Sequence, residues 1–186
     1  MTRRNCSRSF IAWNCYGRSN KERPSQLLTT ADYEERRTVR EHAISLFNKF
    51  SEELYKRAGR LTINVGQKAG FSFDIEIERK DSHGIEQMKV FCYDLVISVL
   101  WSEKAVNPGF LMHDSTLFAD VDERQKAQAV EMAAAQANAK GFQYIVCLNS
   151  DSLPLKDFSA GFDFQSRVRL RLTDETPDGG LLGIRF

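Results

Sequence analysis

The sequence has no apolar run of the roughly 20 residues that a helix needs to cross a bilayer. Its first residues, MTRRNCSRSF, contain no apolar stretch of the kind found in secretory signals. It has only four cysteines, and none of them form a CxxC pair. Cys92 and Cys147 lie within apolar segments, where a reduced cysteine acts as a small hydrophobe. These absences argue against a membrane partner, a disulfide framework and a metal-binding cysteine cluster, and they predict a cytoplasmic protein.

Net charge is also nearly absent, because 26 Lys and Arg residues face 25 Asp and Glu residues. The overall charge of +1 therefore gives no argument for binding to nucleic acid or membranes. The start of the chain differs, since Glu22 is the only acidic residue among several Arg and Lys in the first 23 positions. Residues 1–30 show neither helical nor alternating periodicity, and we interpret them as a basic arm that is disordered or non-native.

Apolar residues spaced three and four positions apart predict a long amphipathic helix in residues 31–58. The stripe consists of Val39, Ala43, Leu46, Phe47, Phe50 and Leu54. So narrow a stripe on a highly charged helix suits the seam of a coiled coil. An ordinary surface helix explains this segment equally well, and both interpretations stay open.

Residues 59–186 are predicted to form one lobe, and across residues 84–148 helices and strands alternate, which is typical of an α/β layered domain. The predicted strands span residues 60–65, 71–78, 109–113, 142–148, 168–173 and 181–186, and the predicted helices span 85–101 and 122–140. Because the segment FQYIVCL at 142–148 is apolar throughout, we expect it to lie centrally in a sheet.

Asp81-Ser82-His83-Gly84 directly precedes the helix predicted at 85–101. A serine hydroxyl, free backbone N–H groups and the positive end of a helix dipole suit the binding of a phosphate. Asp81 or Ser82 would equally cap a helix that binds no ligand, and for this segment alone capping is the better explanation.

Asp114 follows the short apolar strand GFLMH, which we expect to be buried. In open α/β sheets ligands bind at the carboxyl edge, where a carboxylate can hold Mg²⁺ beside nucleotide phosphates. The alternative is that Asp114 only caps the next turn. His113 invites interpretation as a metal ligand, but we expect a hydrogen-bonded structural histidine instead.

A third polar cluster, Asn149-Ser150-Asp151, follows the predicted strand 142–148. If this strand runs parallel to 109–113, both polar clusters converge on one crevice. Strand-end loops are often polar without any such function.

The order of these three segments resembles the C-terminal half of an ABC/SMC-type ATPase head. Ser82-His83-Gly84 matches the core of the signature motif, FLMHD matches the Walker B strand, Asp120-Val121-Asp122 matches the D-loop and CLNSD matches the switch. More closely, SHGIEQMKVFCYDL, GFLMHDSTLF, DVDERQ, GFQYIVCLNSD and GGLLGIRF resemble the YydD-like family. That family is a domain of unknown function (DUF2326) at the C-terminal end of bacterial SMC-like ATPases, and the similarity covers residues 40–186.

The resemblance implies nucleotide-binding roles for four residues. Ser82 and Gly84 would contact the γ-phosphate of an ATP held by a partner head. Asp122 would communicate across the dimer, and Asn149 or Ser150 would sense the γ-phosphate. The helix at 31–58 would be the returning arm of a coiled coil.

The resemblance implies catalytic roles for two more residues. Asp114 would position Mg²⁺ and the attacking water, and Ser150 would act in the switch, where related heads carry a histidine. Ser115 stands where a Walker B strand is usually followed by a water-polarising Glu. The sequence also has no GxxxxGK[ST] phosphate loop, so we expect weak ATP binding without a second lobe.

Three hypotheses follow. The favoured one is half of an SMC-like ATPase head that acts with an N-terminal lobe or as a homodimer, with DNA as a further partner and a role in repair or phage defence. The second is a non-catalytic interaction module or truncated remnant, and the third is a small nucleic-acid-binding protein that uses its basic arm. The first hypothesis also predicts an exposed apolar face or sheet edge, and hence association with the missing lobe or with itself.

Overall fold

The chain is represented by a computed structural model that describes residues 31–66, 70–77, 83–173, 175–176 and 179–180. The basic arm at 1–30, Ser82 and the predicted strand at 181–186 lie outside the described residues. None of the helices in the described ranges is long and apolar enough to cross a membrane.

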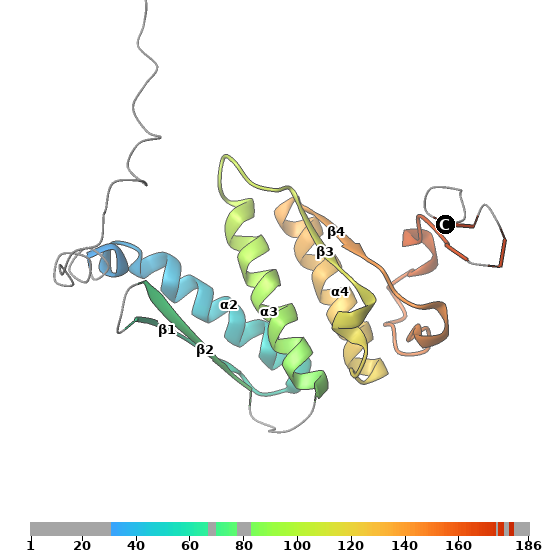
Figure 1. The fold of residues 1–186 in the computed structure, drawn as a ribbon, viewed down its shortest axis with the longest axis horizontal. Helices are drawn as coiled ribbons and strands as arrows, with labels where there is room; N and C mark the ends of the chain where they lie inside the picture. Colours follow the sequence, from blue (N-terminus) through green and yellow to red (C-terminus); the bar gives the residue numbers. More distant parts are fainter. Residues whose placement is uncertain (1–30, 67–69, 78–82, 174, 177–178, 181–186) are drawn as a thin grey trace, which may run out of the picture.

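Helices α3 and α4 run side by side and α2 lies at an angle to them, with one small sheet at each side of the helices (Figure 1). The elements are α2 (Arg37–Tyr55), β1 (Arg60–Val65), β2 (Phe71–Glu76), α3 (His83–Ser102), β3 (Phe110–His113), η1 (Ser115–Phe118), α4 (Glu123–Lys140), β4 (Gln143–Val146), η2 (Ser150–Ser152) and η3 (Gln165–Arg167), where η marks a short 3-10 turn. Residues 31–35 are also helical. The predicted mixture of helices and strands is confirmed.

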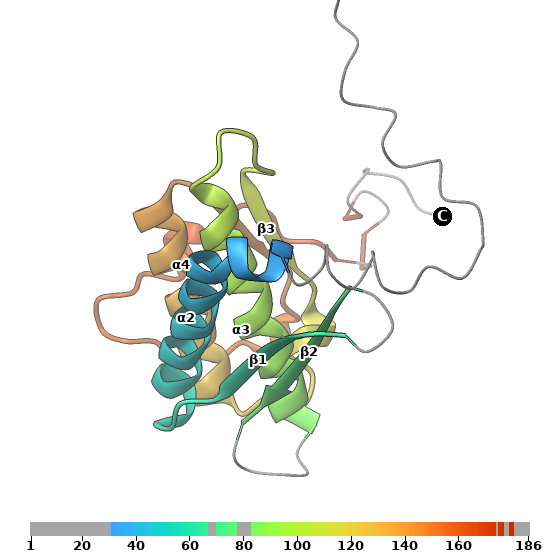
Figure 2. The ribbon, with the colours of Figure 1, turned by 90° about the vertical axis from the view of Figure 1, so that its left-hand side faces the viewer.

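Strands β1 and β2 form an antiparallel hairpin. Its apolar face carries the pairs Leu61–Ile75 and Ile63–Phe73, and Leu61 is buried against the helices. Its opposite face is polar and carries an ion pair between Arg60 and Glu76. Figure 2 shows the hairpin lying across α3. The predicted alternation is therefore confirmed, but the apolar face is only partly buried, because Phe71 is 38% and Phe73 is 54% exposed.

Strands β3 and β4 are parallel, and α4 connects them. Helix α4 begins and ends where the sequence predicts. The Asp122 carboxylate caps its first turn, and Gly141 ends it in the left-handed conformation, with φ of 73°. These local signals set the position of β4 relative to β3.

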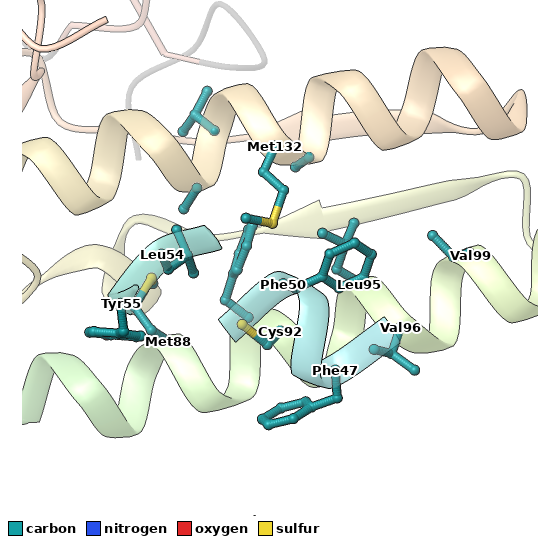
Figure 3. Packing of buried hydrophobic residues seen from close by; sticks show 14 of the residues in the cluster. Phe47, Phe50, Leu54, Tyr55, Met88, Cys92, Leu95, Val96, Val99 and Met132 are labelled. Carbon is teal, nitrogen blue, oxygen red and sulfur yellow. The ribbon is translucent and has the colours of Figure 1, made fainter. Parts of the chain in front are cut away.

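The core joins all three long helices (Figure 3). Phe47 and Phe50 of α2 are fully buried, together with Phe91 and Leu95 of α3. The stripe that predicted α2 thus packs inside this domain from Ala43 onward, whereas Val39 is 46% exposed. Cys92 lies in the same core, where burial raises the pKa of its thiol.

Three predictions about strands are wrong. Residues 168–173 form no strand, because the described residues offer their backbone no ladder partner. Strand β4 is not central, since it pairs with β3 alone in the described part of the chain and its apolar residues are only half-buried. Strand β3 is not fully buried either, because Phe110 is 54% and Met112 is 55% exposed.

Candidate functional site

The carboxyl ends of β3 and β4 lie side by side, as expected from parallel pairing. His113 is opposite Val146 in the register, and the Cys147 N–H extends the ladder by donating to the His113 carbonyl at 3.0 Å. Asp114 and Asn149 therefore follow two adjacent strands at the same edge. This is the edge at which open α/β sheets bind ligands.

Asp114 is exposed and ionised. Its Oδ1 accepts hydrogen bonds from the Thr116 N–H at 2.8 Å and from the Ser115 hydroxyl at 3.1 Å. These hydrogen bonds lower the pKa of Asp114 below its ordinary value of 3.8, and the bond from the Thr116 N–H contributes most. Asp114 therefore caps the turn that follows β3, as one of the two interpretations predicted. The same ionised carboxylate is also suited to binding Mg²⁺.

Gly84 lies in the first turn of α3 and is buried. A Cβ placed on it would lie 2.3 Å from the Asp120 carbonyl oxygen and 3.3 Å from the Val121 Cα. Glycine is needed here because α3 packs its backbone directly against the segment that precedes α4. Packing thus accounts for Gly84 in this chain, and its contact with a γ-phosphate stays a prediction.

Asp122 closes that same segment. Its Oδ1 accepts hydrogen bonds from the backbone N–H groups of Arg124 and Gln125, at 3.1 and 3.3 Å. The Arg124 guanidinium lies 3.9 Å from the same oxygen, and the Asp122 side chain is 61% exposed. Asp122 is therefore accessible to a partner while it starts α4.

Asn149 and Ser150 are exposed at the start of η2. A hydrogen bond holds η2 against α4, because the Lys126 ammonium of α4 donates to the Ser152 carbonyl of η2 at 3.1 Å. Lys126 is only 5% exposed, which is rare for lysine. The sequence prediction missed Lys126, although it lies four residues before the buried Val130 on the inner stripe of α4.

Four segments thus meet at one end of the molecule: the start of α3, the end of β3, the start of α4 and η2 (Figure 1). Within the described residues, no hydrogen bond or ion pair joins Asp114 to Asp122, Asn149 or Ser150. Those residues also include no group of three or more His, Cys, Asp or Glu side chains that could hold a metal ion. Any Mg²⁺ would therefore need ligands from water, nucleotide or another chain in addition to Asp114.

His113 is a structural residue, as expected. It is buried, its Nδ1 lies 3.1 Å from the Tyr144 hydroxyl, and its ring contacts those of Phe91 and Phe118. Its Nε2 lies 3.4 Å from the Asp94 carboxylate, which is too long for a well-formed hydrogen bond. Burial raises the pKa of Tyr144, so the hydroxyl stays neutral beside His113.

A bacterial family described as an uncharacterised protein conserved in bacteria, DUF2326, matches residues 50–186. The chain belongs to this family. The matched part of the DUF2326 domain runs from the end of α2 onward and contains every candidate site residue considered above. A comparison with curated proteins gives no match. The family description states no activity, so a function for this DUF2326 domain has to be argued from its own residues.

Proposed function

We propose that this DUF2326 domain is the C-terminal lobe of an SMC-like, ABC-type ATPase head. In this proposal it binds and hydrolyses Mg-ATP only with an N-terminal lobe that supplies the phosphate loop. Asp114 then orients Mg²⁺ and water and Ser150 acts in the switch, while Ser82, Gly84, Asp122 and Asn149 face nucleotide or partner. The assembled ATPase acts on DNA in a defence or repair system.

The observation that carries the proposal is the incomplete sheet beside Asp114. Purely parallel sheets are normally covered on both faces. On one face of β3–β4, Leu111, Tyr144 and Val146 pack against the helical core. On the other face Phe110 and Met112 are more than half exposed. A lobe that completes a larger sheet would have such a face, and a second lobe would cover it.

The chemistry at the carboxyl edge of this sheet is consistent with that role. Asp114 keeps its negative charge at neutral pH because its pKa is lowered by the Thr116 N–H and the Ser115 hydroxyl. A hard oxygen ligand of this kind suits Mg²⁺, which usually takes one or two protein carboxylates and completes its shell with water and phosphates. Lys126 fixes η2 near the start of α4, so Ser150 has a defined place in the fold.

One observation favours the second candidate, a non-catalytic interaction module. Ser115 follows Asp114 where a water-polarising Glu would be expected, and its hydroxyl is bonded to the Asp114 carboxylate at 3.1 Å. A hydroxyl held in this way is a poor general base. In that case the lobe would still dock on a partner through β3–β4 but would turn over no ATP.

The experiment combines the full chain with a phosphate-loop polypeptide encoded next to it, and measures Mg-ATP binding and hydrolysis by each alone and by the mixture. We expect activity only in the mixture. Asp114→Asn should lower it by about a hundredfold or more, the usual cost of losing one group that stabilises transition-state charge. Asp157→Asn, at an exposed aspartate outside these motifs, is the matched control.

Two other results would contradict parts of the proposal. A stable complex that neither binds nor hydrolyses ATP would establish the interaction module instead. Activity that survives Asp114→Asn as well as Asp157→Asn would remove Asp114 from the site.

A further inference from the structure

Strand β2 has an unpaired edge. In the described residues it pairs with β1 alone, and Phe73 is 54% exposed. Its residues alternate strictly, so that Phe73 and Ile75 lie on the apolar face of the hairpin while Asp74 and Glu76 lie on the polar face. Edges of this kind are templates for the addition of another strand.

The segment Val168–Leu172, with the sequence VRLRL, has the opposite pattern. Arg169 and Arg171 alternate with apolar residues, and Leu170 and Leu172 are 60% and 56% exposed. Because successive side chains of an extended chain point to opposite sides, the arginines lie on one side and the leucines on the other.

The ends of this segment are held, and its middle is open. The Val168 N–H donates to Gln165 at 3.2 Å, and the Thr173 N–H donates to the Gly179 carbonyl at 3.0 Å. Val168 itself is extended, with φ of −66° and ψ of 118°. Between these points, the backbone of residues 169–172 has no hydrogen-bond partner among the described residues. The segment is thus a strand-forming sequence presented without a sheet.

The two unpaired segments are complementary in charge and in hydropathy. When Leu170 is placed beside Ile75, the two arginines flank the two carboxylates of Asp74 and Glu76. This holds for parallel and antiparallel addition, because both patterns repeat every second residue. Opposite charges and apolar pairs that are neighbours across strands both stabilise a sheet.

The two segments cannot meet within one chain of this fold. They lie at opposite ends of the molecule, with α3 and α4 between them (Figure 1). We propose that Val168–Leu172 of one copy adds as a third strand to the free edge of β2 in a second copy, and that the second copy reciprocates. Two such contacts close a twofold dimer.

The apolar side of the added strand would be supported by an existing hollow. A cavity of about 250 Å³ lies between the hairpin, α2 and α3, and Phe71, Phe73 and Tyr93 are among the residues that line it. The side chains of Leu170 and Leu172 would lie on the same face of the hairpin as Phe73, at the rim of this hollow. Strand addition would therefore bury apolar surface on both copies.

The charged groups are available for the new contact. The Arg171 guanidinium now donates to the Gln165 side chain at 2.8 Å, and Glu76 pairs with Arg60 on the polar surface of the hairpin. Exposed contacts of this kind are weak and readily exchanged. No acidic side chain contacts Arg169 in the described part of the chain.

Sedimentation velocity of the full chain, over a range of concentrations and without nucleotide, tests the proposal. We expect a reversible dimer. Asp74→Lys with Glu76→Lys, or Arg169→Glu with Arg171→Glu, should raise the dissociation constant about a hundredfold. The dimer contains four cross-strand charge pairs, and each of them changes from attraction to repulsion. Each change should raise the dissociation constant several-fold. Glu52→Lys with Glu53→Lys, on the exposed side of α2, is the charge-matched control for the double lysine variant.

The decisive step is to mix the two double variants. The lysines on β2 of one variant then face the glutamates of the other, and the unchanged arginines face the unchanged acids. We expect a mixed dimer as tight as the wild-type one, which would also show that both variants are folded. Wild-type chains that stay monomeric, or double variants whose association is unaltered or not restored by mixing, would overturn the proposal. Because ATP and the N-terminal lobe are absent, the outcome is independent of the proposed ATPase.

Discussion

Replacement of Gly84 by alanine gives the sharpest test of how α3 packs on the loop before α4. The new methyl group would lie 2.3 Å from the Asp120 carbonyl oxygen, 3.1 Å from its carbon and 3.3 Å from the Val121 Cα. All three atoms belong to the backbone, so no flexible side chain can move aside. Overpacking of this kind costs about 1 to 3 kcal/mol, and we expect the upper part of that range.

One opposing effect has to be subtracted. Alanine in a helix is more stable than glycine by about 1 kcal/mol. The net loss in the free energy of unfolding for Gly84→Ala is therefore about 2 kcal/mol. With a urea slope of about 2 kcal/mol per molar, the unfolding midpoint should fall by about 1 M.

Gly161→Ala is the matched control, because a Cβ at Gly161 would meet no atom within 4 Å. Its midpoint should stay level or rise slightly, since alanine lowers the entropy of the unfolded chain. The assay is urea unfolding followed by far-ultraviolet circular dichroism, with equal slopes required for all three proteins. A midpoint for Gly84→Ala at or above that of the wild type would refute the close approach of α3 to Asp120.

Two further predictions concern the core and the pH dependence of stability. Phe50→Ala removes a side chain with 0% exposure and should lower the free energy of unfolding by about 3 to 5 kcal/mol. Phe110→Ala removes a side chain that is 54% exposed and should lower it by less than about 1 kcal/mol. Equal losses for the two variants in urea unfolding would contradict the assigned core. Since the pKa of Asp114 is lower in the folded protein than its ordinary 3.8, its ionised form adds stability above that pH, and the contribution is lost as pH falls through the folded pKa. Unfolding midpoints measured from about pH 5 down to pH 2 should therefore fall less steeply for Asp114→Asn than for the wild type or Asp157→Asn, and parallel curves would show that the hydrogen bonds to Asp114 are not formed.

Local signals predicted much of the fold. Strand β1 begins at Arg60 and ends at Val65, as expected from its pattern. The ends of α4 followed from a capping aspartate and a left-handed glycine, which act through neighbouring backbone groups. Such features can be predicted from the sequence because the interacting groups lie within a few residues of each other.

Features that depend on residues distant in the sequence could not be predicted from local patterns. An apolar strand such as β4 can be buried only if other elements cover it, and here only one face is covered. The alternation in Val168–Leu172 indicates strand propensity, but a strand exists only where a second strand accepts its hydrogen bonds.

The candidate site was predicted in part. The parallel ends of β3 and β4 confirm that Asp114 and Asn149 follow adjacent strands. The close contact at Gly84 and the buried ammonium of Lys126 were missed, because both arise from long-range packing between α3, α4 and η2. Their roles became visible only once the neighbouring backbone was placed.

The parallel pairing of β3 with β4 also has a consequence for biosynthesis. In the register His113 is opposite Val146, 33 positions later. At about 5 to 20 residues per second, a ribosome would take roughly 2 to 7 s to make the chain between them. During that interval the backbone of β3 lacks the strand with which it pairs in the folded chain. The hairpin β1–β2 avoids this delay, because its two strands are adjacent in sequence. The β3–β4 pair can therefore form only late in synthesis, after α4 has been made, whereas the hairpin can form as soon as β2 is complete.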